Sequence, residues 1–416
     1  MLSQIITTIS AEIKSYSRAE KLFILFAMLT GFCMTGEYAM TKPTGTSVFI
    51  AAYGSSFYPY AWLATLPFNL CMVWLYNKFV SRIGCFRMLC LTAGAGFGIT
   101  LFCAFNLAQI KWLPFVFYLW KDVYILIMLQ QLWSVIHSTI SKERARYLYG
   151  IIFGVGGLGS IMGSLVPTLF AVQMGSSKIL LFNLPMYLLV MLFYAGVMRL
   201  SKSLPSQKLP EKGDKSGGVK LIRQSKYLQF ILLIVILMQI ASNLLDYRFN
   251  HMVQTSYPNC DVRTQFYGQF WGVIHTVNLC LQFVGSFLCV KLIGLKKSHV
   301  YLPLLLLINS MAFLAMPTLA VMCMAYGTVK AFDYSLFAIL KEMLYVPLRP
   351  EEKFKAKAVI DVFAYRSAKA LASCAVLGLQ LFAISVVSWV AAGIFSCWVV
   401  ASLYFLRRPE QSATVI

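Results

Sequence analysis

The sequence predicts an all-α polytopic membrane protein with about twelve transmembrane helices. Hydrophobic residues make up 59% of the 416 residues and charged residues only 12%, which excludes a water-soluble globular domain. The apolar residues occur in stretches of about 20, the length of a helix that crosses a bilayer core about 30 Å thick. The period-two alternation that a membrane barrel requires is absent, so helices are expected to satisfy the backbone in lipid.

The predicted helices follow one another with mostly short connections. We expect them at 21–41, 56–76, 86–107, 112–139, 149–172, 179–200, 227–248, 266–290, 299–316, 318–347, 363–385 and 387–406. The stretch 201–226 is long, polar and rich in Lys, Ser, Gly and Pro, a composition typical of a linker. The sequence therefore predicts an N-terminal six-helix half at 1–200, a cytoplasmic linker loop at 201–226 and a C-terminal six-helix half at 227–416.

The formal net charge of +21 reflects membrane topology rather than nucleic-acid binding. Lys and Arg residues gather in every second loop, and the intervening loops hold few of them. Because basic loops stay in the cytoplasm, both termini and the central loop are expected there. The first apolar helix has full spanning length and is expected to remain in the mature protein. We expect no nucleic-acid partner.

The two predicted halves carry similar charged positions. An offset of 209 residues places Asp246 on Glu37 and Lys330 on Lys121, with the sign of each charge retained. Two six-helix halves that both start in the cytoplasm form a parallel repeat of the major-facilitator kind, in which the substrate binds midway between the halves. The offset thus predicts a pseudo-symmetric, major-facilitator-like fold, with Lys121 and Lys330 facing each other across a shared site.

Several charged side chains lie within or at the ends of the predicted spans. A charge at the bilayer centre costs about 2.5 to 3.5 kcal/mol, so such residues are retained by a partner or by function. Near the middle of the tenth helix, Lys330 and Asp333 form one stripe with Phe337 and Lys341. The other candidates are Lys121 and Asp122 on helix four, Arg366 and Lys369 on helix eleven, Glu37 with Lys42, and Asp246 with Arg248.

Two interpretations of these charges are open. In the first, Lys121 pairs with Asp122 or Lys330 with Asp333, and the pairs fix helix packing. In the second, the charges bind substrate: four deep basic residues outnumber two deep acids, so a cavity that they line would attract an anion such as phosphate or carboxylate. For Lys42 and Arg248, snorkelling to the membrane interface is a further alternative.

The sequence contains no visible catalytic or metal-binding motif. The eleven cysteines include no Cys-x-x-Cys pair and no His partner at metal-ligand spacing. The segment Gly-Val-Gly-Gly-Leu-Gly at 154–159 matches a dinucleotide fingerprint but lies in an apolar span with no preceding strand, which indicates close helix packing. We expect no cofactor, no metal and no enzymatic activity. Tryptophans near helix ends are interpreted as interfacial anchors: Trp62, Trp112, Trp271 and Trp389.

The most distinctive segment lies at 334–362. It contains Tyr-Ser-Leu-Phe from 334, Lys-Glu-Met-Leu-Tyr-Val-Pro-Leu from 341, Glu-Lys from 352, Lys-Ala-Lys-Ala from 355 and Ile-Asp-Val from 360. This segment resembles the ATP/ADP translocases, the nucleotide transporters of plastids and obligate intracellular bacteria. The resemblance implies a secondary transporter that moves a nucleotide or related phosphorylated anion by alternating access and exchange. It also implies a bacterial inner membrane, where we expect a monomer surrounded by lipid.

Two other functions remain open. One is proton-coupled transport of a different metabolite or a drug, with Asp122, Asp333 or Glu37 as the proton carrier. The other is a membrane structural protein without transport, in which the charges only hold helices together. Uptake that ignores a counter-substrate would favour the first alternative, and the absence of any solute flux would favour the second.

Overall fold

Helices account for every regular element in the part of the chain that the computed structural model describes. This part comprises residues 16–140, 142–203, 218–287, 292–345, 348, 356–357 and 359–406. The first helices and 3-10 turns in chain order are α2 (Arg18–Tyr53), η1 (Ser55–Phe57), α3 (Tyr58–Ile83), α4 (Cys85–Asn106), α5 (Leu113–Thr139), α6 (Lys142–Met174), η2 (Lys178–Phe182) and α7 (Asn183–Ser201). Gly54 and Gly84 separate consecutive elements. Their φ angles of +79° and +80° are not helical, and glycine adopts such positive values more readily than residues with a side chain.

The later elements include two π-helical turns. In order they are α8 (Gly218–Gln224), α9 (Lys226–Ser256), α10 (Cys260–Phe287), α11 (Leu295–Ala315), α12 (Leu319–Phe332), the π turn η5 (Asp333–Phe337), α13 (Ala338–Tyr345), the π turn η6 (Val359–Ala364), α15 (Tyr365–Leu379) and α16 (Ser385–Leu406). Side-chain caps help to start two of these helices. Ser225 accepts a bond from the amide of Leu228, and Thr318 accepts one from the amide of Val321.

The observed helices confirm the predicted all-α polytopic fold. Eight described helices are long and apolar enough to cross a membrane. The first helix is longer than expected: α2 contains 36 residues, or about 54 Å at 1.5 Å per residue, and continues through Pro43 where the prediction ended at residue 41. The tenth predicted span is also different, because η5 interrupts it between α12 and α13.

The chain forms two compact units. Unit 1 contains the described residues of Met1–Ala52, Pro67–Leu209 and Asn259–Thr276, and unit 2 contains those of Tyr53–Leu66, Pro210–Pro258 and Val277–Ile416. Unit 1 therefore includes the beginning of α10, and unit 2 includes the beginning of α3.

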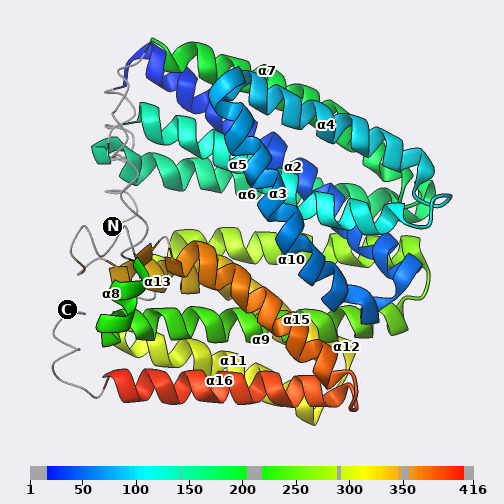
Figure 1. The fold of residues 1–416 in the computed structure, drawn as a ribbon, viewed down its shortest axis with the longest axis vertical. Helices are drawn as coiled ribbons and strands as arrows, with labels where there is room; N and C mark the ends of the chain where they lie inside the picture. The colour runs from blue at the N-terminus through cyan, green and yellow to red at the C-terminus, as the bar shows by residue number, and fades with distance from the viewer. Residues whose placement is uncertain are drawn as a thin grey trace. The chain divides into compact units, whose positions relative to one another are not determined.

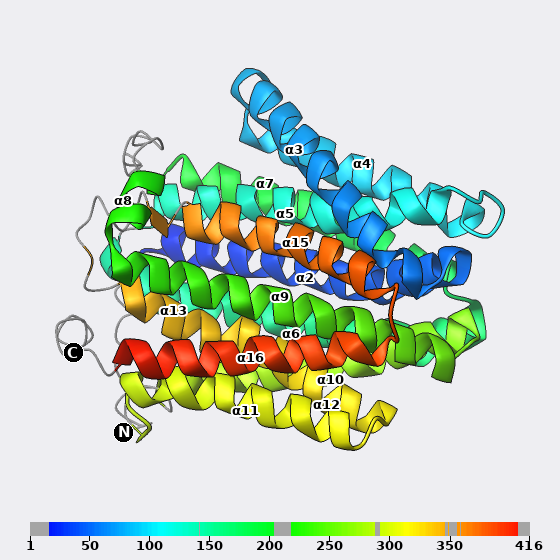
Figure 2. The same cartoon turned by 60° about the horizontal axis from the view of Figure 1, so that its bottom comes forward.

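Within unit 1, α4 lies along α7 and also packs on α5 (Figure 1). Phe23, Leu89, Tyr124 and Tyr187 belong to its buried core. In unit 2, α9 packs against α12, α15 and α16, and α11 lies along α16 (Figure 2). Each unit is thus built around long helices that bury one side against their neighbours.

Helices α2 and α6 of unit 1 approach closely at glycines. A Cβ atom on Gly163 would collide with the backbone of Gly36, and one on Gly159 would collide with the backbone of Phe32. The Thr35 hydroxyl donates a hydrogen bond of 2.6 Å to the carbonyl of Gly156 at the same contact. These contacts confirm that the segment 154–159 serves helix packing.

Candidate functional site

A polar stripe on α2 organises the candidate site of unit 1. Tyr38, Lys42 and Gly45 follow at i, i+4 and i+7, so they share one face of the helix. The ammonium nitrogen of Lys42 lies 3.2 Å from the centroid of the Trp271 ring, which belongs to α10. Lys42 is half-buried, while Trp271 is only 5% exposed. The contact is a cation–π interaction on a largely buried ring.

Lys121 on α5 lies against the same stripe. Its side chain occupies the space beside Gly45, where a Cβ atom would come within 2.7 Å of the Lys121 Cδ atom. The Lys121 ammonium donates to Asp122 Oδ1 at 2.7 Å and lies 4.0 Å from the centroid of the Tyr118 ring. The Tyr38 hydroxyl also donates to Asp122, at 3.4 Å.

We call this group the unit-1 cluster. Its members are Tyr38, Lys42, Tyr118, Lys121, Asp122 and Trp271. It holds two ammonium groups, one carboxylate and three aromatic rings, so it carries a net positive charge. The expected pairing of Lys121 with Asp122 is confirmed.

Glu37 lies in a separate hydrogen-bond network of unit 1. Its side chain is buried, and its carboxylate accepts bonds from Thr41 at 2.6 Å, Tyr124 at 2.5 Å and Tyr187 at 2.8 Å. The Thr41 hydroxyl in turn accepts a bond of 2.7 Å from the amide of Asn183. The network joins α2, α5 and α7, which favours a packing role for Glu37 over substrate contact.

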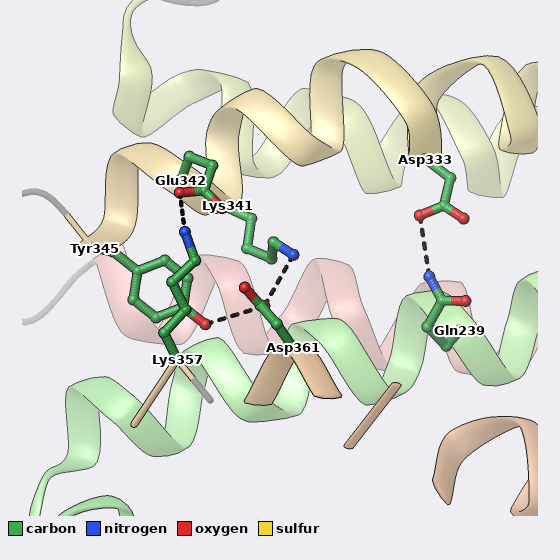
Figure 3. A network of polar contacts seen from close by, with 7 residues as sticks. All are labelled: Gln239, Asp333, Lys341, Glu342, Tyr345, Lys357 and Asp361. Atoms are coloured by element: carbon green, nitrogen blue, oxygen red, sulfur yellow. Dashed lines mark hydrogen bonds and ion pairs between the residues drawn. The ribbon is translucent and has the colours of Figure 1, made fainter. Parts of the chain in front are cut away.

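In unit 2, Lys330 and Asp333 have different partners. The Lys330 ammonium donates to the Ser242 hydroxyl at 2.9 Å and lies 5.5 Å from the centroid of the Tyr326 ring. Asp333 accepts a bond of 3.0 Å from the amide of Gln239, and its second oxygen is buried without a partner (Figure 3). Among the described residues no direct ion pair joins Lys330 to Asp333: Ser242 accepts the bond from the ammonium, and the two charges interact only electrostatically.

The π turn η5 changes the register of the tenth predicted span. A π turn takes one residue more than an α turn, so Lys341, beyond η5, is shifted from the ideal α-helical stripe. Lys330 and Lys341 nevertheless both lie close enough to Asp333 to interact with it electrostatically. Lys341 forms an ion pair of 2.9 Å with Asp361, which also accepts a bond from Tyr345 (Figure 3). A second ion pair joins Lys357 to Glu342 at 2.5 Å, which also ties the end of α13 to the segment before η6.

The remaining predicted site residues are dispersed. Asp246 is half-buried and accepts a bond of 2.7 Å from Asn250 on its own helix. Arg248 lies 5.8 Å from the Phe313 ring, and its Nε atom is buried without a partner. The Lys369 ammonium lies 5.8 Å from the Trp62 ring within unit 2. The side chain of Arg366 lies outside the described residues.

Two tryptophan rings contact lysine ammonium groups, Trp271 with Lys42 and Trp62 with Lys369, and the sequence did not predict either as a site residue. Trp62 and Trp271 are 2% and 5% exposed, so the interpretation as interfacial anchors is wrong for both. Trp112 and Trp389, each 59% exposed, fit that interpretation. Trp271 lies 209 residues after Trp62, the same offset that relates the charged residues. This spacing is the feature of the sequence that indicates a shared role for the two tryptophans.

Within the described ranges, no three His, Cys, Asp or Glu side chains gather where they could bind a metal ion. The chemistry of the unit-1 cluster is that of anion and aromatic recognition: ammonium groups for a phosphate or carboxylate, and ring faces for a flat apolar group.

Comparison with solved structures confirms the major-facilitator-like fold. The chain aligns with the nucleoside transporter NupG at a TM-score of 0.61 and 13% identity, over 94% of this chain and 100% of that chain. It aligns with a bacterial homologue of the iron transporter ferroportin, in an inward-facing state, at a TM-score of 0.65 and 13% identity, over 94% and 100%. At this identity the likeness concerns the fold alone.

Sequence comparison gives the family. ADP,ATP carrier protein 1 of Chlamydia pneumoniae is 24% identical over 305 residues, which is 62% of this chain and 59% of the relative. ADP,ATP carrier protein 1 of Rickettsia prowazekii (strain Madrid E) is 29% identical over 173 residues, 36% of this chain and 34% of the relative. The chain thus spans less than two thirds of the length of these curated relatives, which are carriers and not enzymes. The family model described as TLC ATP/ADP transporter matches residues 165–326 and 318–406, more than half of the chain, so the chain is a multi-pass membrane protein that belongs to this family.

Proposed function

We propose that the chain moves a nucleotide or a related phosphorylated anion across a membrane, by alternating access and exchange. The observation that carries this proposal is the net positive unit-1 cluster, in which Lys42 and Lys121 are held beside aromatic rings. A membrane protein retains such groups at a cost, and phosphate oxygens are natural acceptors for ammonium donors. The names of the ADP,ATP carrier relatives support a nucleotide as the substrate.

Lys121 is proposed as an anion-binding residue that exchanges partners. In the structure its ammonium is bonded to Asp122, and a substrate phosphate would take the place of this carboxylate. A hydrogen bond to a charged group contributes about 1.5 to 3 kcal/mol, so the exchange conserves most of the interaction free energy. The Tyr38 hydroxyl, already bonded to Asp122, would keep the released carboxylate partnered.

Lys330 is proposed as the corresponding residue of unit 2. It lies 209 residues after Lys121, and the Ser242 hydroxyl orients its ammonium at 2.9 Å. The hydroxyl partner is neutral, and the nearby Asp333 carboxylate interacts with Lys330 only electrostatically, so we propose that a substrate anion can bond the ammonium. Lys369 and Arg366 would add basic charge in the same unit. We assign Asp333 a supporting role beside Lys330, leave the dispersed Asp246 and Arg248 outside this group, and assign Glu37 a packing role.

The test is exchange in liposomes that contain the purified protein. We expect uptake of labelled ATP or ADP to require unlabelled nucleotide inside the vesicles. Lys121→Ala and Lys330→Ala should each raise the half-saturating nucleotide concentration about 10- to 100-fold, since each removes one charged hydrogen bond. Lys178→Ala is the matched control, because Lys178 is exposed on η2 and should leave uptake unchanged.

Other results would select the alternatives. Absence of uptake with a full panel of nucleotides would contradict the nucleotide assignment. Uptake of another solute that collapses with the pH gradient and ignores internal nucleotide would indicate proton-coupled transport. If the lysine variants change only the melting temperature and no solute crosses, the charges serve the structure.

A further inference from the structure

The ring of Trp271 packs against two other rings and has a lysine over one face. Phe270 lies edge-on to it, with 5.5 Å between ring centroids and 79° between planes. The His275 ring, one turn further along α10, lies 6.0 Å away at 32°. The Lys42 ammonium stands over the ring at 3.2 Å. The ring is thus packed against two neighbouring rings, while the group over its face is a long lysine side chain that is half-buried.

We propose that this face of Trp271 stacks on the nucleobase of the transported nucleotide, and that Lys42 moves from the ring to the phosphate chain. The inference rests on the proposed function and extends it, because it assigns base recognition to one residue. It makes the preferred substrate a nucleotide with an aromatic base, rather than a phosphorylated sugar or a free polyphosphate.

Energetic balance supports the exchange of Lys42 for a base. A cation–π contact is worth about 2- to 30-fold in an equilibrium constant. A base stacked on an aromatic side chain is worth about 5- to 150-fold. The interaction free energy at the ring therefore changes little when a base replaces the Lys42 ammonium. The released ammonium then gains a hydrogen bond to phosphate.

The spacing within unit 1 fits a single nucleotide. Lys42 and Gly45 are separated by about 4.5 Å along α2, since three residues rise 1.5 Å each. The Lys121 side chain lies against Gly45 and the Trp271 ring lies against Lys42, so both contacts are made on the same face of α2. Phosphates at the two lysines would leave the base within reach of the ring.

The test compares ATP with inorganic tripolyphosphate, which has the phosphates but no base. Binding is measured on the purified full-length protein in one detergent. We expect Trp271→Leu to weaken ATP binding about 5- to 150-fold and to leave tripolyphosphate binding unchanged. Lys42→Ala should weaken both ligands. Trp112→Leu, at an exposed position, is the matched control and should change neither.

A measurement on folded protein is available if Trp271→Leu fails to fold. ATP, but not tripolyphosphate, should quench part of the tryptophan fluorescence of the unmodified protein, and Trp271→Phe should remove that difference. Equal losses for both ligands in Trp271→Leu, or quenching that persists in Trp271→Phe, would overturn the stacking proposal. If the unmodified protein transports ATP and the Trp271 variants bind ATP as tightly as it does, only the stacking proposal fails. If the unmodified protein binds no nucleotide, the proposed function fails as well.

Discussion

At the scale of single residues, equivalent positions in the two halves have different environments. Glu37 is buried and accepts three hydroxyl hydrogen bonds from α2, α5 and α7. Asp246, 209 residues later, is half-buried and bonded by Asn250 on its own helix. The offset relates the two acids along the chain, but the neighbouring helices decide what each carboxylate does.

This difference predicts unequal effects on stability. Glu37→Ala leaves the hydroxyls of Thr41, Tyr124 and Tyr187 without their acceptor, and one unsatisfied buried polar group costs about 1 to 3 kcal/mol. We expect a large fall in the melting temperature. Asp246→Ala is the matched control and should lower it much less. Thermal unfolding of both variants in one detergent measures the difference, and equal shifts would contradict the packing role of Glu37.

Sequence reasoning located the charged residues better than their partners. Charges stand out in apolar spans because lipid penalises them, so Lys121 and Lys330 could be found from hydropathy. The partner of Lys121 could also be found, since Asp122 is the next residue. Ser242, which bonds Lys330, lies 88 residues away on another helix, and only the tertiary fold brings it there. The contact of Trp271 with Lys42 also forms only in the tertiary fold, and the 209-residue spacing from Trp62 is the signal for Trp271 in the sequence.

At the scale of elements, hydropathy predicts where helices occur but not how regular they are. The π turns η5 and η6 each add one residue to a turn without changing the apolar content of the span. No feature of the hydropathy pattern therefore marks them. Their consequence is local: Lys341, beyond η5, pairs with Asp361 within η6.

The glycine contact between α2 and α6 predicts a second difference in stability. Gly163→Ala places a methyl group against the backbone of Gly36, which moves only if the helix moves. We expect a marked fall in melting temperature. Gly150→Ala on the same helix is the control: its Cβ would meet open space, and alanine favours a helix over glycine by about 1 kcal/mol. If both variants melt alike, close packing at Gly163 does not stabilise unit 1.

At the scale of the whole molecule, the fold class could be predicted because lipid restricts the choice to helices and barrels. The position where the first helix ends could not be predicted from hydropathy. Hydropathy falls after residue 41, yet α2 continues to Tyr53 because Thr41, Thr44 and Ser47 are buried inside unit 1. Polar residues end an apolar stretch but do not end a helix whose neighbours cover them.

The distribution of basic residues also predicts the orientation of the chain in the membrane. Basic residues in alternate loops predict that both termini and the loop 201–226 lie in the cytoplasm. In a bacterial host, green fluorescent protein fused after residue 203, behind six spans, should fluoresce, as it does in the cytoplasm. Alkaline phosphatase fused after residue 258 should be active, since α9 carries the chain outward while the seven-residue α8 is too short to cross. The exchanged fusions at the same two positions are the controls and should both be silent. Phosphatase activity after residue 203 would place the loop 201–226 outside the cytoplasm, and the predicted orientation would then be wrong.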